Sequence, residues 1–261
     1  RDKGCVAGNE RAWGCPWFEQ PNRMDRANSC GVCLECVKAC PEGNMTLFLR
    51  PPLSEGRLQG WDEAFKAWLM LALALAYSAV YLGPWGALKD VANVAVSGDW
   101  LGFLGFASGL WALALVVLPG LFLATAGLGR PLAGRPAVPW RAAALSGASA
   151  AVPFGLLAWI AFSVPLALVN GSYVLSVVSD PLGWGWDLFG TAHLPWTPVA
   201  PQWTPFLQAG LILAGQALAM RRGWAETLAL YGDRGRALRG FGPTAALLGG
   251  VSVVFLWLHV G

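Results

Sequence analysis

Long apolar runs dominate the chain after residue 60, with polar and charged residues confined to short intervals between them. A helix needs about 20 mostly apolar residues to cross the hydrocarbon core of a bilayer. The pattern therefore predicts five transmembrane helices, at about residues 67–88, 101–129, 142–173, 206–220 and 241–260. The fourth run is short, and we expect Trp203, Arg221 and Arg222 at its ends to reach toward the membrane interfaces.

The first sixty residues have a different pattern. They are rich in cysteine, proline and charge, and they contain no apolar run long enough to form a conventional core. The change near Gly60 predicts two domains, a small head at residues 1–60 and a transmembrane helical domain at residues 61–261.

Composition excludes several classes of protein. The 261 residues are 56% hydrophobic and 13% charged, whereas about a quarter of the residues are charged in a typical soluble domain. The net charge is only +3, and no basic patch is large enough to indicate nucleic-acid binding. We therefore expect an integral membrane protein, in contact with lipid and not with nucleic acid.

The charges in the loops predict an orientation. The loops after the second and fourth spans are rich in arginine, whereas the loop after the first span is poor in it and the long segment 175–205 has no Lys or Arg. Positive loops stay in the cytoplasm. We therefore expect the head on the cytoplasmic side and the C-terminus outside.

One motif in the head carries the chemistry. Cys30, Cys33, Cys36 and Cys40, followed by Pro41, form the C-x2-C-x2-C-x3-C-P pattern of bacterial ferredoxins. With two residues between successive cysteines, three thiolates can coordinate three iron atoms of one cubane cluster. The backbone N–H groups of the same loop then point at the sulfides of the cluster. The spacing predicts one [4Fe–4S] cluster.

Other uses of these cysteines fit less well. Zinc sites usually combine two separated C-x2-C pairs or mix Cys with His, and neither is present nearby. Disulfides are disfavoured in the cytoplasm. The fourth ligand is open between Cys40 and Cys15, because in two-cluster ferredoxins the fourth Cys of such a run ligates the other cluster. If Cys40 faced a second cluster, Cys5 would be the one cysteine left to join it, and two thiolates are too few to hold a [4Fe–4S] cluster. Cys5 is therefore open between a ligand and a free or structural thiol.

The segment GCPWFEQPNRMDRANSCGVCLECVKACPEGNMTL resembles the ferredoxin-type module of polytopic bacterial membrane iron–sulfur proteins. This group includes the membrane ferredoxin-like proteins of nitrate and nitrous oxide reductase systems and a cytochrome oxidase assembly protein. The resemblance implies a mostly α-helical protein of a bacterial or archaeal cell membrane, in which a ferredoxin-like head precedes a polytopic bundle of about five transmembrane helices. It also implies cluster ligation by Cys30, Cys33, Cys36 and Cys40, with Cys15 as a further candidate. Those proteins commonly have two complete four-Cys runs, and this chain has one.

Few residues in the helices indicate further cofactors. Gln208 and Gln216 could bind a quinone headgroup, although such residues more often join neighbouring helices. The only histidines are His193 and His259, both expected near the outer surface, so we expect no bis-histidine haem within the bundle. The spans hold no acidic or basic residue away from their ends, which disfavours an ion-coupled transporter.

These observations favour an electron-transfer subunit that relays electrons between a redox partner or the quinone pool and an acceptor complex, in company with other redox subunits. A transporter or channel with a structural or sensing cluster is one alternative, and an assembly factor for a membrane redox enzyme is another. No motif of an autonomous hydrolase, kinase or nicotinamide dehydrogenase occurs, so a subunit of a redox complex is favoured over an independent enzyme.

Overall fold

The computed structural model describes residues 4–24, 30–49, 57–82, 88–134, 138–195 and 201–260. About 75% of the chain is helical. It divides into two compact units, Arg1–Gly56 and Arg57–Gly261, which we call the N-terminal unit and the helical unit.

The N-terminal unit is built from short elements. The helix α1 (Gly4–Ala7) leads into a hairpin of β1 (Gly8–Asn9) and β2 (Ala12–Trp13), in which Gly8 pairs with Trp13 and Asn9 with Ala12. A 3-10 turn η1 (Pro21–Arg23) and the helix α2 (Glu35–Ala39) follow. This two-stranded sheet does not show the ferredoxin-like fold expected for the head.

Two hydrogen bonds hold the hairpin against α2. The Asn9 side chain donates to the carbonyl oxygen of Ala39 at 2.7 Å, and the backbone N–H of Trp13 donates to the Glu35 carboxylate at 3.2 Å. Ala39 is fully buried. Because the unit has so little apolar core to bury, these polar contacts largely fix the position of α2.

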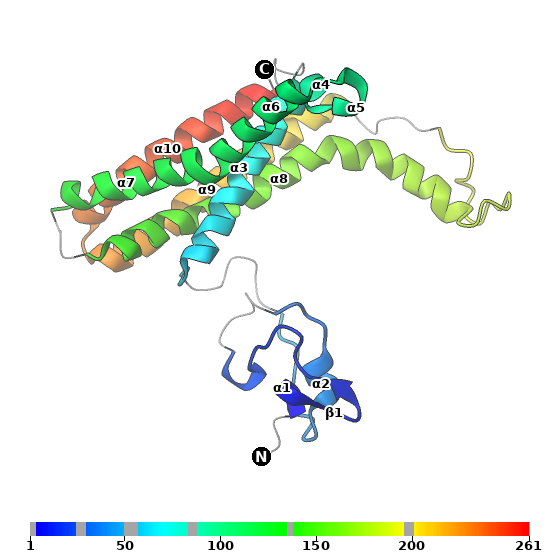
Figure 1. The fold of residues 1–261 in the computed structure, drawn as a ribbon, viewed down its shortest axis with the longest axis horizontal. Helices are drawn as coiled ribbons and strands as arrows, with labels where there is room; N and C mark the ends of the chain where they lie inside the picture. Colours follow the sequence, from blue (N-terminus) through cyan, green and yellow to red (C-terminus); the bar gives the residue numbers. More distant parts are fainter. Residues whose placement is uncertain are drawn as a thin grey trace. The chain divides into compact units, whose positions relative to one another are not determined.

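The helical unit contains longer helices (Figure 1). In chain order they are α3 (Trp61–Leu82), α4 (Leu88–Ala92), α5 (Val94–Ser97), α6 (Trp100–Ala112), the π-helical turn η2 (Leu113–Val117), α7 (Leu118–Leu132), α8 (Trp140–Ser179), the 3-10 turn η3 (Pro201–Trp203), α9 (Thr204–Tyr231) and α10 (Arg234–Val260). The shared core is made of α3, α7, α8, α9 and α10, with Trp68, Phe122, Phe154 and Phe255 as its largest fully buried apolar side chains.

Four helices of the described chain are long and apolar enough to cross a membrane, which identifies the chain as a membrane protein. They are Trp61–Leu82, Trp100–Leu132, Trp140–Leu168 and Arg234–Val260. The fifth predicted span, residues 206–220, lies within α9 and is not among these four. Polar Gln208 and Gln216 and the arginines at 221 and 222 lower the apolar content of α9, which packs mainly between α8 and α10.

The ends of the helices differ from those predicted. α3 begins at Trp61 rather than 67 and ends at Leu82 rather than 88, and residues 83–87 lie outside the described residues. The acids Asp62 and Glu63 fall outside an apolar window, yet negative charge stabilises the first turn of a helix. α8 continues to Ser179, and Figure 1 shows its second half leaving the other helices. Its 40 residues span about 60 Å, twice the hydrocarbon thickness.

Many of the arginines of the helical unit gather at one end, where α3, α8 and α10 begin and α7 and α9 finish. We call it the arginine end. Arg141 of α8 donates to the carbonyl oxygen of Gln59 at 2.7 Å, and Arg130 of α7 donates to that of Val138 at 3.0 Å. These bonds tie the ends of the helices to the segments that connect them.

Candidate functional site

The cysteine run lies in a loop and in the short helix that follows it. Cys30 and Cys33 are exposed in the loop, Cys36 is half-buried in α2, and Cys40 is the residue at which α2 ends. The residue that caps the start of α2 is Leu34, in the left-handed conformation with φ of 63°. The 2-residue spacing is therefore accommodated by a tight loop that runs directly into a helical turn.

This loop is strained. Val32 has φ of 51° and Leu34 has φ of 63°, a region that side chains larger than glycine occupy rarely and at a cost of about 1–3 kcal/mol each. The conformation turns the backbone N–H of Val32 toward the sulfur of Cys30, 3.4 Å away. Such strain concentrates at sites where function requires one backbone geometry, and here the geometry supplies an N–H donor to a sulfur.

Three of the cysteines influence one another. Burial raises the pKa of the Cys36 thiol, and electrostatic repulsion from Cys30 and Cys33 raises it further. The first three cysteines of the motif are therefore near enough to influence one another electrostatically. A metal centre would deprotonate the thiols that coordinate it.

The sulfur of Cys40 has a different environment. The backbone N–H of Asn44 lowers the pKa of the Cys40 thiol, burial opposes this effect, and the N–H groups of Glu42, Gly43 and Met45 lower the pKa further. The amide groups of the chain after Cys40 therefore favour the thiolate form of this residue. Donors of this kind stabilise a thiolate, and they also tune the potential of sulfur-ligated clusters.

Cys15 follows the hairpin. Its backbone N–H donates to the carbonyl oxygen of Val6 at 3.2 Å, and its own carbonyl accepts from Phe18 at 3.1 Å. Phe18, like Val32 and Leu34, has positive φ, at 55°. Cys15 is half-buried. The side chain of Cys5 lies outside the described residues.

The indole of Trp17 connects this turn to the cysteine loop. It lies so close to Gly31 that a Cβ on Gly31 would collide with Nε1 and Cε2 of the ring. A side chain on Gly31 would therefore require the Trp17 ring to move, and the turn after Cys15 contacts the loop of the first three cysteines. Among the described residues, no group of three or more His, Cys, Asp or Glu side chains is placed so that it could hold a metal ion.

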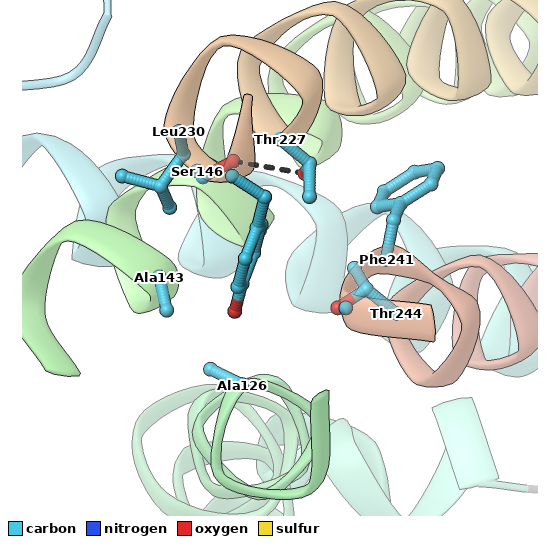
Figure 2. Close-up of a pocket in the computed structure, with 10 residues that line it drawn as sticks. Ala126, Ala143, Ser146, Thr227, Leu230, Phe241 and Thr244 are labelled. Carbon is cyan, nitrogen blue, oxygen red and sulfur yellow. Dashed lines mark hydrogen bonds between the residues drawn. The ribbon is translucent and has the colours of Figure 1, made fainter. Parts of the chain in front are cut away.

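The helical unit has its own polar cluster near the arginine end, where Figure 2 shows Ser146, Thr227 and Thr244 lining a small cavity. The hydroxyls of Ser146 in α8 and Thr227 in α9 lie 3.1 Å apart, and Thr244 of α10 donates to Thr125 of α7 at 3.0 Å. We call these four residues the hydroxyl cluster. The cavity beside it is only about 10 Å³, room for one water molecule at most, so the cluster joins helices and leaves no space for a substrate.

The two glutamines of α9 join helices as well. Gln208 is buried and donates to the carbonyl oxygen of Ala161 in α8 at 3.0 Å, and Gln216 accepts from Ser252 in α10 at 2.9 Å. The interpretation as interhelical contacts is thus confirmed, and quinone binding stays a prediction. Nδ1 of His259 lies 2.9 Å from the carbonyl oxygen of Phe255 in its own helix, and His193 lies in the loop after α8.

Sequence reasoning missed one polar pair. Arg222 and Glu226 of α9 form an ion pair of 3.3 Å in which the two side chains are only 14% and 12% exposed. Their spacing of four residues is a signal for such a pair, but it gives no indication of burial.

Comparisons of the chain with protein family models, with curated proteins and with solved structures found no match.

Proposed function

We propose that this chain is a membrane-bound iron–sulfur protein that relays single electrons between a redox partner or the quinone pool and an acceptor complex. The observation that carries the proposal is the C-x2-C-x2-C-x3-C-P run in a strained loop, in which the backbone N–H of Val32 donates to the sulfur of Cys30. The helical unit would serve as the anchor. The proposal includes a ferredoxin-type head, as the resemblance of residues 5–50 implies.

The donor set fits a [4Fe–4S] cluster. Cys30, Cys33 and Cys36 would supply three thiolates, and all of them are free thiols in the structure. Cys40 is favoured as the next ligand of this cluster because amide donors already stabilise its thiolate, while Cys15 remains the alternative. When bound, such a cluster accepts and releases one electron at a potential set by hydrogen bonds to sulfur, charge and exposure.

The residues around the cysteines would then bind the cluster and set its reduction potential. The N–H of Val32 and those of residues 42–45 would donate to ligand sulfurs and favour the reduced, more negative state. Lys38 is a cation of α2 whose pKa is raised by its hydrogen bond with Glu35, and it also interacts with Cys33. A cation beside the thiolates would raise the potential in the same way.

The proposed placement puts the N-terminal unit in the cytoplasm and the C-terminus outside. It rests on the loop charges, since the arginine end contains Arg130, Arg141 and Arg222, whereas residues 175–195 contain no Lys or Arg. Electrons would then be exchanged with partners on the cytoplasmic side of the membrane.

The experiment uses the full chain purified anaerobically and reconstituted in lipid nanodiscs. Dithionite reduces the cluster and is then removed. An oxidised quinone analogue or an oxidised viologen is added, and reoxidation of the cluster is followed by EPR. We expect a rhombic one-electron signal that disappears on reoxidation and is absent in Cys33→Ser. Flux of a solute in proteoliposomes that is unaffected by Cys33→Ser would instead support the transport alternative and contradict the proposal.

A further inference from the structure

A second cavity opens at the arginine end of the helical unit. Its volume is about 250 Å³, much larger than the space beside the hydroxyl cluster. Two guanidinium groups, of Arg57 and Arg141, line it together with Gln59, Ser146 and Glu226, and the remaining lining is largely leucine. We call it the arginine pocket.

Both arginines are oriented by bonds to backbone carbonyls. Nη2 of Arg57 donates to the carbonyl oxygen of Glu226 at 3.3 Å, and Nη2 of Arg141 donates to that of Gln59 at 2.7 Å. A guanidinium carries five N–H donors in a fixed plane. The planar fork of these donors matches the oxygens of a phosphate group, so an arginine oriented by a backbone carbonyl is a suitable ligand for phosphate.

The charge of the pocket favours an anion. Arg222 pairs with the carboxylate of Glu226 through Nε and Oε1 at 3.3 Å. The other nearby acid, Glu63, accepts the backbone N–H groups of Gln59 and Gly60 at the start of α3. Among the residues that line the pocket, the arginines Arg57 and Arg141 outnumber the single acid, Glu226.

One acceptor at the pocket lacks a donor. Oε2 of Glu226 is buried and has no hydrogen-bond partner among the described residues. Burial raises the pKa of this carboxyl group, whereas the nearby Ser149 hydroxyl, which donates to the carbonyl oxygen of Ser146 at 2.9 Å, lowers it. A buried carboxylate oxygen without a donor is costly, and a ligand that carries hydroxyl groups as well as a phosphate would satisfy it.

The residues beside the pocket are typical of a membrane interface. Arg141 directly follows Trp140, the first residue of one membrane-capable helix, and Gln59 precedes Trp61, the first residue of another. Tryptophan concentrates at the membrane interface. Basic pockets between membrane helices are typical binding sites for anionic headgroups, and the leucines of the lining suit the start of an acyl chain.

We propose that the arginine pocket binds the phosphate group of an anionic phospholipid with headgroup hydroxyls, of the phosphatidylglycerol kind. Arg57 and Arg141 would bind the phosphate oxygens, and a headgroup hydroxyl would donate to Glu226. The site is independent of the cysteine run, so its test does not depend on a cluster.

The test is native mass spectrometry of the full chain released from nanodiscs, titrated with phosphatidylglycerol, phosphatidylcholine or inorganic phosphate. The variant is R57Q/R141Q, and the control is R236Q/R239Q, which removes the same charge at the same end from arginines outside the pocket. We expect the affinity for phosphatidylglycerol to fall about tenfold in the variant and less than twofold in the control, with phosphatidylcholine bound weakly by all three proteins. If R57Q/R141Q does not fold, R141Q alone, which changes one exposed side chain, should still lower the affinity at least threefold.

Three outcomes would overturn the proposal. The first is an affinity for phosphatidylglycerol that R57Q/R141Q and R141Q leave unchanged. The second is an equal loss in the control, because charge at the arginine end rather than the pocket would then explain binding. The third is inorganic phosphate that binds at micromolar concentration and displaces the lipid, which would identify a soluble phosphate as the ligand.

Discussion

Gly129 of α7 lies directly against Gly240 of α10, so that a Cβ added to Gly129 would collide with the carbonyl oxygen of Gly240. Gly240 in turn lies under the ring of Tyr231, where its own Cβ would come 2.8 Å from Cε2. Two backbones can approach this closely only where neither carries a side chain. The contact fixes the crossing of α7 and α10 near the arginine end.

Gly129→Ala should therefore destabilise the helical unit. A backbone carbonyl cannot move aside as a flexible side chain can, so we expect a loss of about 1–3 kcal/mol in the free energy of unfolding. Denaturant titration in detergent micelles, followed by circular dichroism, measures it. Gly105→Ala is the matched control because nothing lies within 4 Å of that position, and a loss of equal size there would contradict a steric cause.

Gly31→Val should disrupt the cysteine loop through Trp17. The added side chain would occupy the position of the indole, and we expect cluster content to fall at least fivefold in anaerobically purified protein. The double variant Gly31→Val with Trp17→Ala removes the obstacle and should recover at least half of the iron. Failure of Trp17→Ala to rescue would show that the ring does not define the loop.

The hydroxyl pair Ser146 and Thr227 should show a measurable coupling. Because each hydroxyl is buried and lies 3.1 Å from the other, a double-mutant cycle with Ser146→Ala and Thr227→Val should give about 0.5–1.5 kcal/mol. Ser163, whose hydroxyl donates to Trp159 in its own helix at 2.8 Å, supplies the comparison. A cycle of Ser163→Ala with Thr227→Val should give no coupling, and a zero for the first cycle would argue against the contact.

The loop after α8 should loosen in acid. Asp187 accepts from the Ala192 N–H at 3.0 Å and from the buried Ser179 hydroxyl at 2.9 Å. The N–H of Ala192 and the Ser179 hydroxyl lower the pKa of Asp187 below its usual value near 4. The carboxylate therefore stabilises the loop above about pH 4, and this contribution is lost as the pH falls through the folded pKa.

Hydrogen exchange of the amides of Thr191 and Ala192 measures this effect once intrinsic rates are divided out. We expect their protection to decrease below about pH 4 in the wild type. In Asp187→Asn it should be low at every pH, whereas Asp90→Asn on α4 should behave like the wild type. Protection that stays constant between pH 6 and pH 3 in the wild type would exclude the carboxylate as the holding group.

The sequence predicted the helices better than their ends. Apolar runs locate α3, α7, α8 and α10 because membrane helices need that length of apolar chain. They miss the start of α3, where Asp62 and Glu63 are stabilised by the helix terminus. They also miss the π-helical turn before Pro119, because its position depends on how the backbone adjusts to the N–H group that proline lacks. Contacts between distant positions, such as Arg57 with Glu226, follow from packing that residue periodicity does not encode.

For the cysteine run too, the sequence predicts which residues matter but not the backbone conformation that positions them. Its spacing identified candidate ligands from residue type alone, and the structure adds the positive φ of Val32 and Leu34, the amides around Cys40 and the contact of Trp17 with Gly31. No periodicity or motif could have predicted these, because they depend on which turn the backbone adopts between the cysteines.

Iron and acid-labile sulfide analysis of the anaerobically purified chain, with EPR after dithionite reduction, tests the proposed cluster most directly. We expect about four irons and four sulfides per chain in the wild type, a near-complete loss in Cys33→Ser, and a loss in Cys40→Ser that exceeds the loss in Cys15→Ser. Stoichiometric zinc without sulfide, or iron that survives Cys33→Ser, would contradict an iron–sulfur centre held by this run of cysteines.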